Sequence, residues 1–230
     1  MINSWLMPFT LAVFIIGVAL SIIFFLLKKG IAIKLLGLYT LTLALGIAEP
    51  LMHIYSFSQK TITYYGGVSF LYGPLLFLYV RYTCLGKQVL AIKDLLHFIP
   101  AMLYVLLIMI QPTKSASANE DALAEVVLYE LFACQVVVYM LKAISIFRRS
   151  VSSANVDDVV KMKYAFIKNL VLFSVILFGS SFVFTHMVLL TRTFPVQGAF
   201  QTYIQLGLTF MILLIAFLNT EMTQPKRMTP

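Results

Sequence analysis

The sequence predicts an all-α membrane protein, a bundle of seven transmembrane helices, and two observations support this fold class. Of the 230 residues, 61% are hydrophobic and only 11% are charged, whereas a soluble domain carries roughly 25% charged residues. The hydrophobic residues gather into seven segments that are long enough, or nearly so, to cross a hydrocarbon core of about 30 Å as helices. Most of the protein surface is therefore expected to face lipid.

The predicted spans form one domain, residues 1–219, and a short tail, residues 220–230, follows them. In chain order the spans cover residues 5–27, 33–57, 64–82, 95–111, 122–146, 160–190 and 199–219. The first apolar run stops at Lys28 and Lys29, and the third stops at Arg81. The fourth begins within KDLLHFIP, and the seventh is TYIQLGLTFMILLIAFLN. Because the seventh span has no lysine for a retinal Schiff base, a rhodopsin is excluded.

Charged and capping residues mark the boundary between the fifth and sixth spans. Arg148 and Arg149 close the fifth span, where cations suit the carbonyl end of a helix. Asn155 is expected to cap the sixth, with Asp157 and Asp158 in its first turn. The sixth helix is therefore expected to begin in water and to enter the membrane through KMKYAFIKN.

The distribution of basic residues predicts the orientation, because lysine and arginine are retained on the cytoplasmic side. With the N-terminus outside, 14 of the 17 basic residues fall in cytoplasmic segments and 3 fall outside. The inner group is Lys28, Lys29, Lys34, Arg81, Lys87, Lys93, Lys142, Arg148, Arg149, Lys161, Lys163, Lys168, Lys226 and Arg227; the outer group is Lys60, Lys114 and Arg192. We therefore expect an outside N-terminus, a cytoplasmic C-terminus and basic inner loops that face anionic lipid.

Five ionisable residues lie in the outer halves of three predicted spans. Glu49 and His53 share one face of the second span, Glu125 and Glu130 lie in the first turns of the fifth, and His186 lies near the outer end of the sixth. Ionisable groups inside a membrane are costly and mark functional sites. We therefore predict a ligand-binding polar pocket that opens to the outside. A purely structural role in holding helices together stays open, and Glu125 is close enough to the interface to reach lipid headgroups.

The chemistry of these residues does not favour catalysis. HExxH and GxSxG motifs are missing from the sequence, so we expect no enzyme and no cofactor. His53 and His186, at matched depth, leave a haem or metal site as a less favoured alternative, with no metal assigned. A transporter is also less favoured, because the later half has no broken helix to match Pro50 and Pro74.

Gly73 and Pro74 interrupt the third span and predict a hinge. Proline has no N–H to donate to the carbonyl of Phe70, so we expect a neighbouring helix, a hydroxyl or a water to satisfy that carbonyl. The glycine beside it allows another chain segment to approach closely.

The segments FLYGPLLFLYVR and KDLLHFIPAMLY resemble the membrane-embedded N-terminal region of a group of bacterial AraC-type transcriptional regulators. In that group a seven-helix domain precedes a cytoplasmic helix-turn-helix region. The segment LLIAFLNTEMTQP is similar to the point where those proteins leave the membrane. The resemblance implies a signal-receiving role in a bacterial inner membrane. The helix-turn-helix region is not among these residues, so we expect no direct nucleic acid binding by this chain.

These observations favour a sensor or receptor-like membrane domain that passes an outside signal to a membrane or cytoplasmic protein partner. Besides the lipid bilayer, a second copy of the chain is also open as a partner. The main alternative is a structural or accessory subunit of a bacterial envelope complex.

Overall fold

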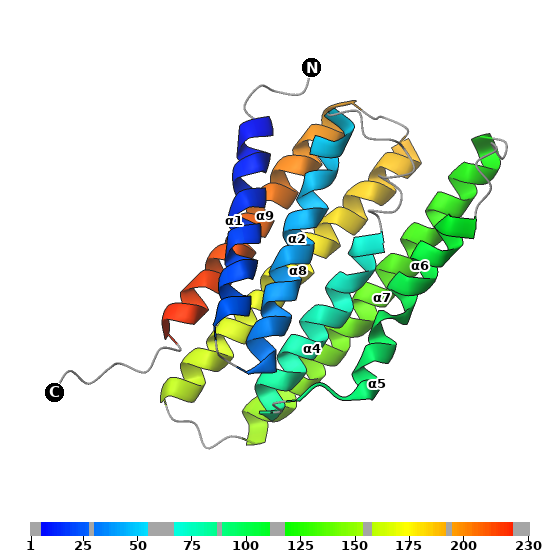
Figure 1. Cartoon of the computed structure of the whole chain (residues 1–230). Helices are drawn as coiled ribbons and strands as arrows, with labels where there is room; N and C mark the ends of the chain where they lie inside the picture. The colour runs from blue at the N-terminus through cyan, green and yellow to red at the C-terminus, as the bar shows by residue number, and fades with distance from the viewer. Residues whose placement is uncertain are drawn as a thin grey trace.

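The computed structural model describes residues 6–27, 30–54, 67–86, 89–110, 118–153, 158–191 and 195–222, and in these ranges the chain is helical without strands. Figure 1 shows the helices as one elongated bundle. The elements are α1 (Leu6–Leu26), α2 (Ile31–Ile54), the 3-10 helix η1 (Gly67–Leu71), α4 (Tyr72–Leu85), α5 (Ile92–Leu95), the 3-10 helix η2 (Leu96–Phe98), α6 (Ile99–Ile110), α7 (Ala118–Ser153), α8 (Asp158–Thr191) and α9 (Pro195–Met222).

Each of the seven predicted spans contains a helix, and within the described ranges five helical stretches are long and apolar enough to cross a membrane. These stretches are Met7–Leu26, Ile31–Ala48, Gly67–Leu85, Val127–Ser152 and Lys163–Phe184. The helix α6 is shorter, with 12 residues, and α9 contributes the shorter apolar stretch Ile204–Leu218. The protein is therefore an all-α, multi-pass membrane protein by the length and composition of its helices.

Small residues bring α1 and α2 close together. A methyl group added at Gly17 of α1 would lie 2.6 Å from Cβ of Ala44 in α2, and one added at Gly37 of α2 would lie 3.0 Å from Cβ of Phe24 in α1. Without a strong hydrophobic force between helices in lipid, small residues at the interface let backbones approach and gain dispersion contacts. The two helices form the antiparallel pair on one side of Figure 1.

The remaining helices pack around a core that contains buried hydroxyl groups as well as apolar side chains. α4 lies between α2 and α7, while α8 packs on both α7 and α9. Tyr39 of α2 and Ser174 of α8 are fully buried, and their hydroxyl oxygens lie 2.7 Å apart. Ser174 donates its own proton to the carbonyl of Leu170, at 2.8 Å, so Tyr39 is the donor to Ser174.

The predicted interruption of the third span is a change of helix type. The residues before Gly73 form the 3-10 helix η1, and Pro74 lies in the first turn of α4. We predicted a bend inside one helix; a proline is better tolerated where an α-helix begins. α4 ends at Gly86, whose φ of 64° is a left-handed conformation that suits glycine.

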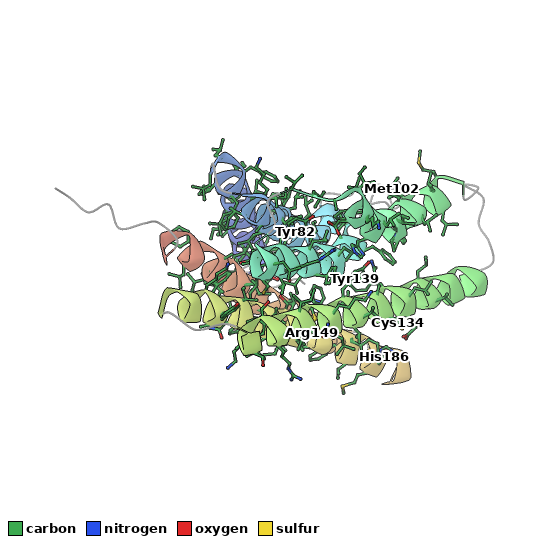
Figure 2. All side chains as sticks on the ribbon, turned by 90° about the horizontal axis from the view of Figure 1, so that it is seen from below. Tyr82, Met102, Cys134, Tyr139, Arg149 and His186 are labelled. Atoms are coloured by element: carbon green, nitrogen blue, oxygen red, sulfur yellow. The ribbon has the colours of Figure 1, made fainter. Side chains whose placement is uncertain are left out.

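Exposed large apolar side chains lie on α1, α6, α7, α8 and α9. Figure 2 shows Met102 on α6 at the edge of the bundle and Cys134 on α7. Cys134 is exposed and Cys84 is partly buried, and both are free thiols.

Candidate functional site

Glu130 of α7 and His186 of α8 meet where the apolar stretch of α7 begins and that of α8 ends. Oε1 of Glu130 lies 2.7 Å from Nε2 of His186. Glu130 is three residues inside the start of the stretch Val127–Ser152, and His186 is two residues beyond the end of Lys163–Phe184. The side chains are 42% and 33% exposed, respectively. The pair therefore joins two helices, and both of its side chains are partly exposed.

The contacts of His186 determine how many protons the Glu130–His186 pair must hold. Its Nδ1 lies 2.9 Å from the carbonyl oxygen of Phe182, which is only an acceptor. Its Nε2 faces the carboxyl group of Glu130, which is also only an acceptor when ionised. Both contacts are hydrogen bonds when the imidazole carries two protons, or when it carries one at Nδ1 and Glu130 carries the other. In either case the pair holds two protons, and both contacts of His186 are then hydrogen bonds.

Aromatic and polar side chains surround this pair. The ring of Phe182 lies 4.0 Å from that of His186, and Tyr129 stacks on Phe182 with centroids 6.4 Å apart. The Tyr129 hydroxyl donates to the carbonyl of Ser181 at 3.3 Å. We call Tyr129, Glu130, Phe182 and His186 the outer cluster, after its predicted orientation. Its aromatic walls and acid–base pair can bind a proton or a small polar ligand.

The outer cluster extends to α9 through an amide. Nε2 of Gln205 donates to the Ser181 hydroxyl at 3.1 Å. Helices α7, α8 and α9 are thereby linked by polar contacts at one level of the bundle.

The other predicted site residues are placed only by their backbones. Glu49 and His53 lie in the last turns of α2, and Glu125 lies in the second turn of α7. Their side chains are outside the described part of the structure. Within the described part, no group of three or more histidine, cysteine or acidic side chains is placed to hold a metal ion.

The neighbouring helix α7 supplies the hydrogen-bond donor expected for the Phe70 carbonyl. Nε2 of Gln135 in α7 donates to this oxygen at 3.1 Å. Gly73, in turn, faces the side chain of Tyr139, one helical turn further along α7: a methyl group added there would lie 3.1 Å from Cβ of Tyr139. The Gly-Pro pair is therefore a docking point for α7.

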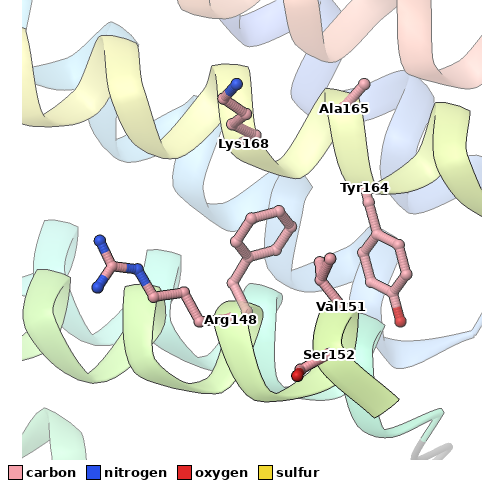
Figure 3. A pocket seen from close by; sticks show the side chains of 7 residues that line it. Arg148, Val151, Ser152, Tyr164, Ala165 and Lys168 are labelled. Carbon is pink, nitrogen blue, oxygen red and sulfur yellow. The ribbon is translucent and has the colours of Figure 1, made fainter. Parts of the chain in front are cut away.

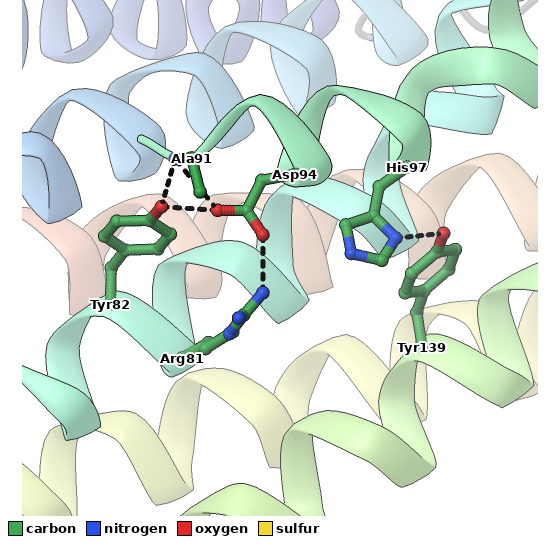
Figure 4. Close-up of polar contacts among 6 residues, drawn as sticks. All are labelled: Arg81, Tyr82, Ala91, Asp94, His97 and Tyr139. Carbon is green, nitrogen blue, oxygen red and sulfur yellow. Dashed lines mark hydrogen bonds and ion pairs between the residues drawn. The ribbon is translucent and has the colours of Figure 1, made fainter. Parts of the chain in front are cut away.

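A second polar cluster joins the end of α4 to the start of α5 (Figure 4). Asp94 is only 2% exposed. Its carboxylate accepts hydrogen bonds from Arg81 and from the Tyr82 hydroxyl, and it accepts a third, at 3.2 Å, from the backbone N–H of Ala91. The Ala91 N–H also donates to the Tyr82 hydroxyl at 3.0 Å. We call Arg81, Tyr82, Ala91 and Asp94 the inner cluster.

The electrostatics of the inner cluster keep Asp94 ionised. Burial acts to raise the pKa of its carboxyl group, but the hydrogen bonds from Tyr82 and Ala91 and the charge of Arg81 outweigh burial. The pKa therefore lies below its usual value. Arg81 is 27% exposed, so one side of this ion pair still reaches solvent.

His97 continues the polar contacts from the inner cluster to α7. Its Nδ1 lies 2.9 Å from the Tyr139 hydroxyl, as Figure 4 shows. Phe77 of α4 meets both rings, at 5.2 Å from His97 and 5.6 Å from Tyr139. On the other side, Nζ of Lys142 lies 5.6 Å from the centre of the Tyr139 ring, a cation–π distance. His97 therefore links the segment before α6 to α7 by a hydrogen bond.

Sequence reasoning missed the pairing of Arg81 with Asp94, although it singled out both residues. The available signal was an arginine at the end of one apolar segment and an aspartate at the start of the next, with Gly86 between them to reverse the chain. Charges at neighbouring ends of two consecutive spans lie at the same depth.

Comparisons with protein-family models, curated proteins and solved structures found no match for this chain.

Proposed function

We propose that this protein is a membrane-embedded sensory domain with seven spans, an outside N-terminus and a cytoplasmic C-terminus, in a bacterial inner membrane. The asymmetric distribution of its basic residues supports the orientation. The resemblance of its third and fourth spans to AraC-type membrane regulators supports the sensory role and the bacterial setting.

The observation that carries this proposal is the position of α7 between two polar sites. At its outer part, α7 carries Glu130, which binds His186. Nine residues later, about 14 Å along the helix, Tyr139 contacts Gly73 and His97. A shift or rotation of α7 caused at the outer cluster would therefore change the contacts that hold α4 and the start of α6. Helix α7 thus contacts both sites, as an element that passes a signal between them must do.

The proton is the signal that the outer cluster itself favours. Loss of one proton from the Glu130–His186 pair leaves a neutral imidazole beside a carboxylate, so the attraction between opposite charges is lost and the link between α7 and α8 weakens. The facing groups are Glu130 and Tyr129 from α7 and, one step further, Gln205 from α9 through Ser181. An unperturbed histidine titrates between about pH 5 and pH 8, and a partner carboxylate favours its protonated form.

The experiment measures the separation of α7 and α8 as the pH changes. Spin labels on Cys134 and on Val183→Cys, both exposed positions, would report this distance in lipid nanodiscs, with Cys84→Ser removing the second thiol. We expect one narrow distance distribution at acid pH and a broader or longer one at alkaline pH.

Glu130→Gln tests whether the proton, rather than the contact itself, controls the separation of the helices. The amide does not titrate, and it offers both a donor and an acceptor to either form of the imidazole. This variant is expected to keep one distribution at every pH. Arg149→Gln, a charge removal at the other end of α7, is the matched control and should behave as the parent. A parent distribution that does not change with pH would refute the proton as the signal.

A further inference from the structure

A cleft of about 480 Å³ opens between the last turns of α7 and the first third of α8. Figure 3 shows Arg148 on one helix and Lys168 on the other, among the residues that line this opening. The cleft lies at the end of the bundle opposite to the outer cluster, where the apolar stretch of α7 ends at Ser152 and that of α8 begins at Lys163. It is therefore at the boundary between hydrocarbon and headgroups. Its volume falls within the range of pockets that hold small ligands.

The charges of the cleft are all positive. Arg148 and Lys168 are exposed, and neither forms an ion pair within the described residues. The other lining residues that the structure describes carry no acidic side chain. Two exposed cations on adjacent helices, with no acidic side chain among the described lining residues, favour an anion such as a phosphate group.

The walls of the cleft are apolar and ordered. Tyr164 donates to the carbonyl of Ser150 at 3.3 Å, and its ring meets that of Phe147 edge to face at 5.8 Å. These contacts hold the tyrosine against α7. Val151 completes the apolar side of the cleft.

The faces that carry the two cations continue into the membrane as exposed leucines. Leu141 is two helical turns before Arg148 on α7, and Leu172 is one turn after Lys168 on α8, so each lies on the same face as its cation. They are 61% and 48% exposed. Because α7 and α8 run antiparallel, both leucines lie deeper in the membrane than the cations. A ligand bound here would contact the cations at the membrane interface and the apolar track, formed by Leu141 and Leu172, deeper in the membrane.

We propose that this cleft binds an anionic phospholipid, with its headgroup attracted by the flexible side chains of Arg148 and Lys168 and an acyl chain along Leu141 and Leu172. A lipid fits better than a free phosphate, because a free anion uses only the cations and leaves the apolar track unused. The lipid would join α7 to α8 at their inner ends, as the Glu130–His186 pair does at their outer ends. The site does not depend on the proposed sensory function.

The test is retention of lipid by the purified full chain, measured by native mass spectrometry after equilibration with phosphatidylglycerol or phosphatidylcholine. A basic residue near a membrane surface contributes about 1 kcal/mol to the binding of anionic lipid, which corresponds to about fivefold in affinity. We expect Arg148→Gln and Lys168→Gln each to weaken phosphatidylglycerol binding about fivefold. Arg148→Lys keeps the charge and should retain most of the binding.

Arg149→Gln is the matched control, because it removes the same charge at the next position, which does not line the cleft. It should bind phosphatidylglycerol as the parent does. Equal losses in the Arg148 and Arg149 variants would mean non-specific attraction and would overturn the proposal. So would equal retention of phosphatidylcholine and phosphatidylglycerol by the parent. Inorganic phosphate should not displace bound phosphatidylglycerol at comparable concentration; displacement would assign the cleft to a free anion.

Discussion

Gln135 and Pro74 are predicted to be energetically coupled through the carbonyl of Phe70. In an uninterrupted α-helix this oxygen would accept from the N–H of residue 74, which proline does not have. The amide of Gln135 donates to it instead, at 3.1 Å. The variant Gln135→Leu removes this donor. In a Pro74→Ala background the restored backbone N–H can take its place, so the same variant should cost less there.

The expected size of this coupling follows from two measures of hydrogen bonding. Leaving a buried acceptor unsatisfied costs about 1–3 kcal/mol in soluble proteins, whereas side-chain hydrogen bonds in a membrane average about 0.6 kcal/mol and reach about 1.7 kcal/mol. We therefore expect a coupling energy of about 1 kcal/mol. The single variant Gln135→Leu should show less than this, because it also removes Oε1 of Gln135, which is buried without a partner among the described residues.

The assay is a double-mutant cycle on the free energy of unfolding, with SDS titration of the protein in mixed micelles followed by far-ultraviolet circular dichroism. Cys134→Leu is the control, because it adds an apolar side chain to an exposed neighbouring position of α7. Its effect should be the same with Pro74 and with Ala at that position. If Gln135→Leu costs the same free energy in both backgrounds, then its amide does not compensate for the proline, and the reasoning is refuted.

Three further predictions concern the inner cluster, the α1–α2 contact and the buried hydroxyl pair. Asp94→Asn should lower the free energy of unfolding by roughly 1–3 kcal/mol at neutral pH. Because folding lowers the pKa of Asp94, the parent should be the more stable protein above the unfolded pKa near 3.9, and this difference in stability should be lost as the pH falls through the pKa of the folded state. Melting temperatures measured against pH would follow the loss. Gly17→Ala, which brings a methyl carbon 2.6 Å from a carbon of α2, should cost about 1–3 kcal/mol, whereas Gly207→Ala, with open space around it, should be near neutral in the same SDS titration. Ser174→Ala should cost about 1–3 kcal/mol and more than Tyr39→Phe, at about 1 kcal/mol, because the first leaves a buried donor without this acceptor and the second leaves Ser174 bonded to a backbone carbonyl.

Three results would contradict these predictions. An Asp94→Asn protein that loses stability in acid as steeply as the parent would mean that other carboxyl groups dominate. Equal costs for the two glycine variants would remove the close contact as the cause. A larger loss for Tyr39→Phe than for Ser174→Ala would reverse the assigned direction of the hydrogen bond.

Much of the helical architecture can be predicted from the sequence, because lipid leaves a chain few ways to satisfy its backbone. Long apolar runs must become helices, and each predicted span does contain one. Depth is also readable: counting residues from the helix ends put Glu130 and His186 at one level, and these two residues meet in the structure. Whether this level holds a ligand pocket stays a prediction.

The rotation of each helix about its axis is harder to predict. Depth alone could not say that Gln135 would face Phe70, or that His186 would turn toward Glu130. Polar residues on α7 and α8 could equally have faced other helices, because both helices carry apolar side chains on most of their sides. The inner cluster was missed for another reason: it depends on a chain reversal at Gly86 and on the short helix α5, whose geometry leaves little trace in hydropathy.

The unequal apolar lengths of α7 and α8 have a consequence for the outer cluster. The stretch in α7 has 26 residues and that in α8 has 22, so in two helices packed side by side about 6 Å of α7 extends beyond its neighbour. If this excess falls at the end that carries Glu130 and His186, the acid–base pair lies among lipid headgroups. Its protons exchange with the water layer at the membrane surface, where anionic headgroups lower the local pH and salt screens this effect. The bulk pH at which Glu130 and His186 separate should therefore shift with the charge of the surrounding lipid and with salt, and a measurement in neutral detergent would miss that shift.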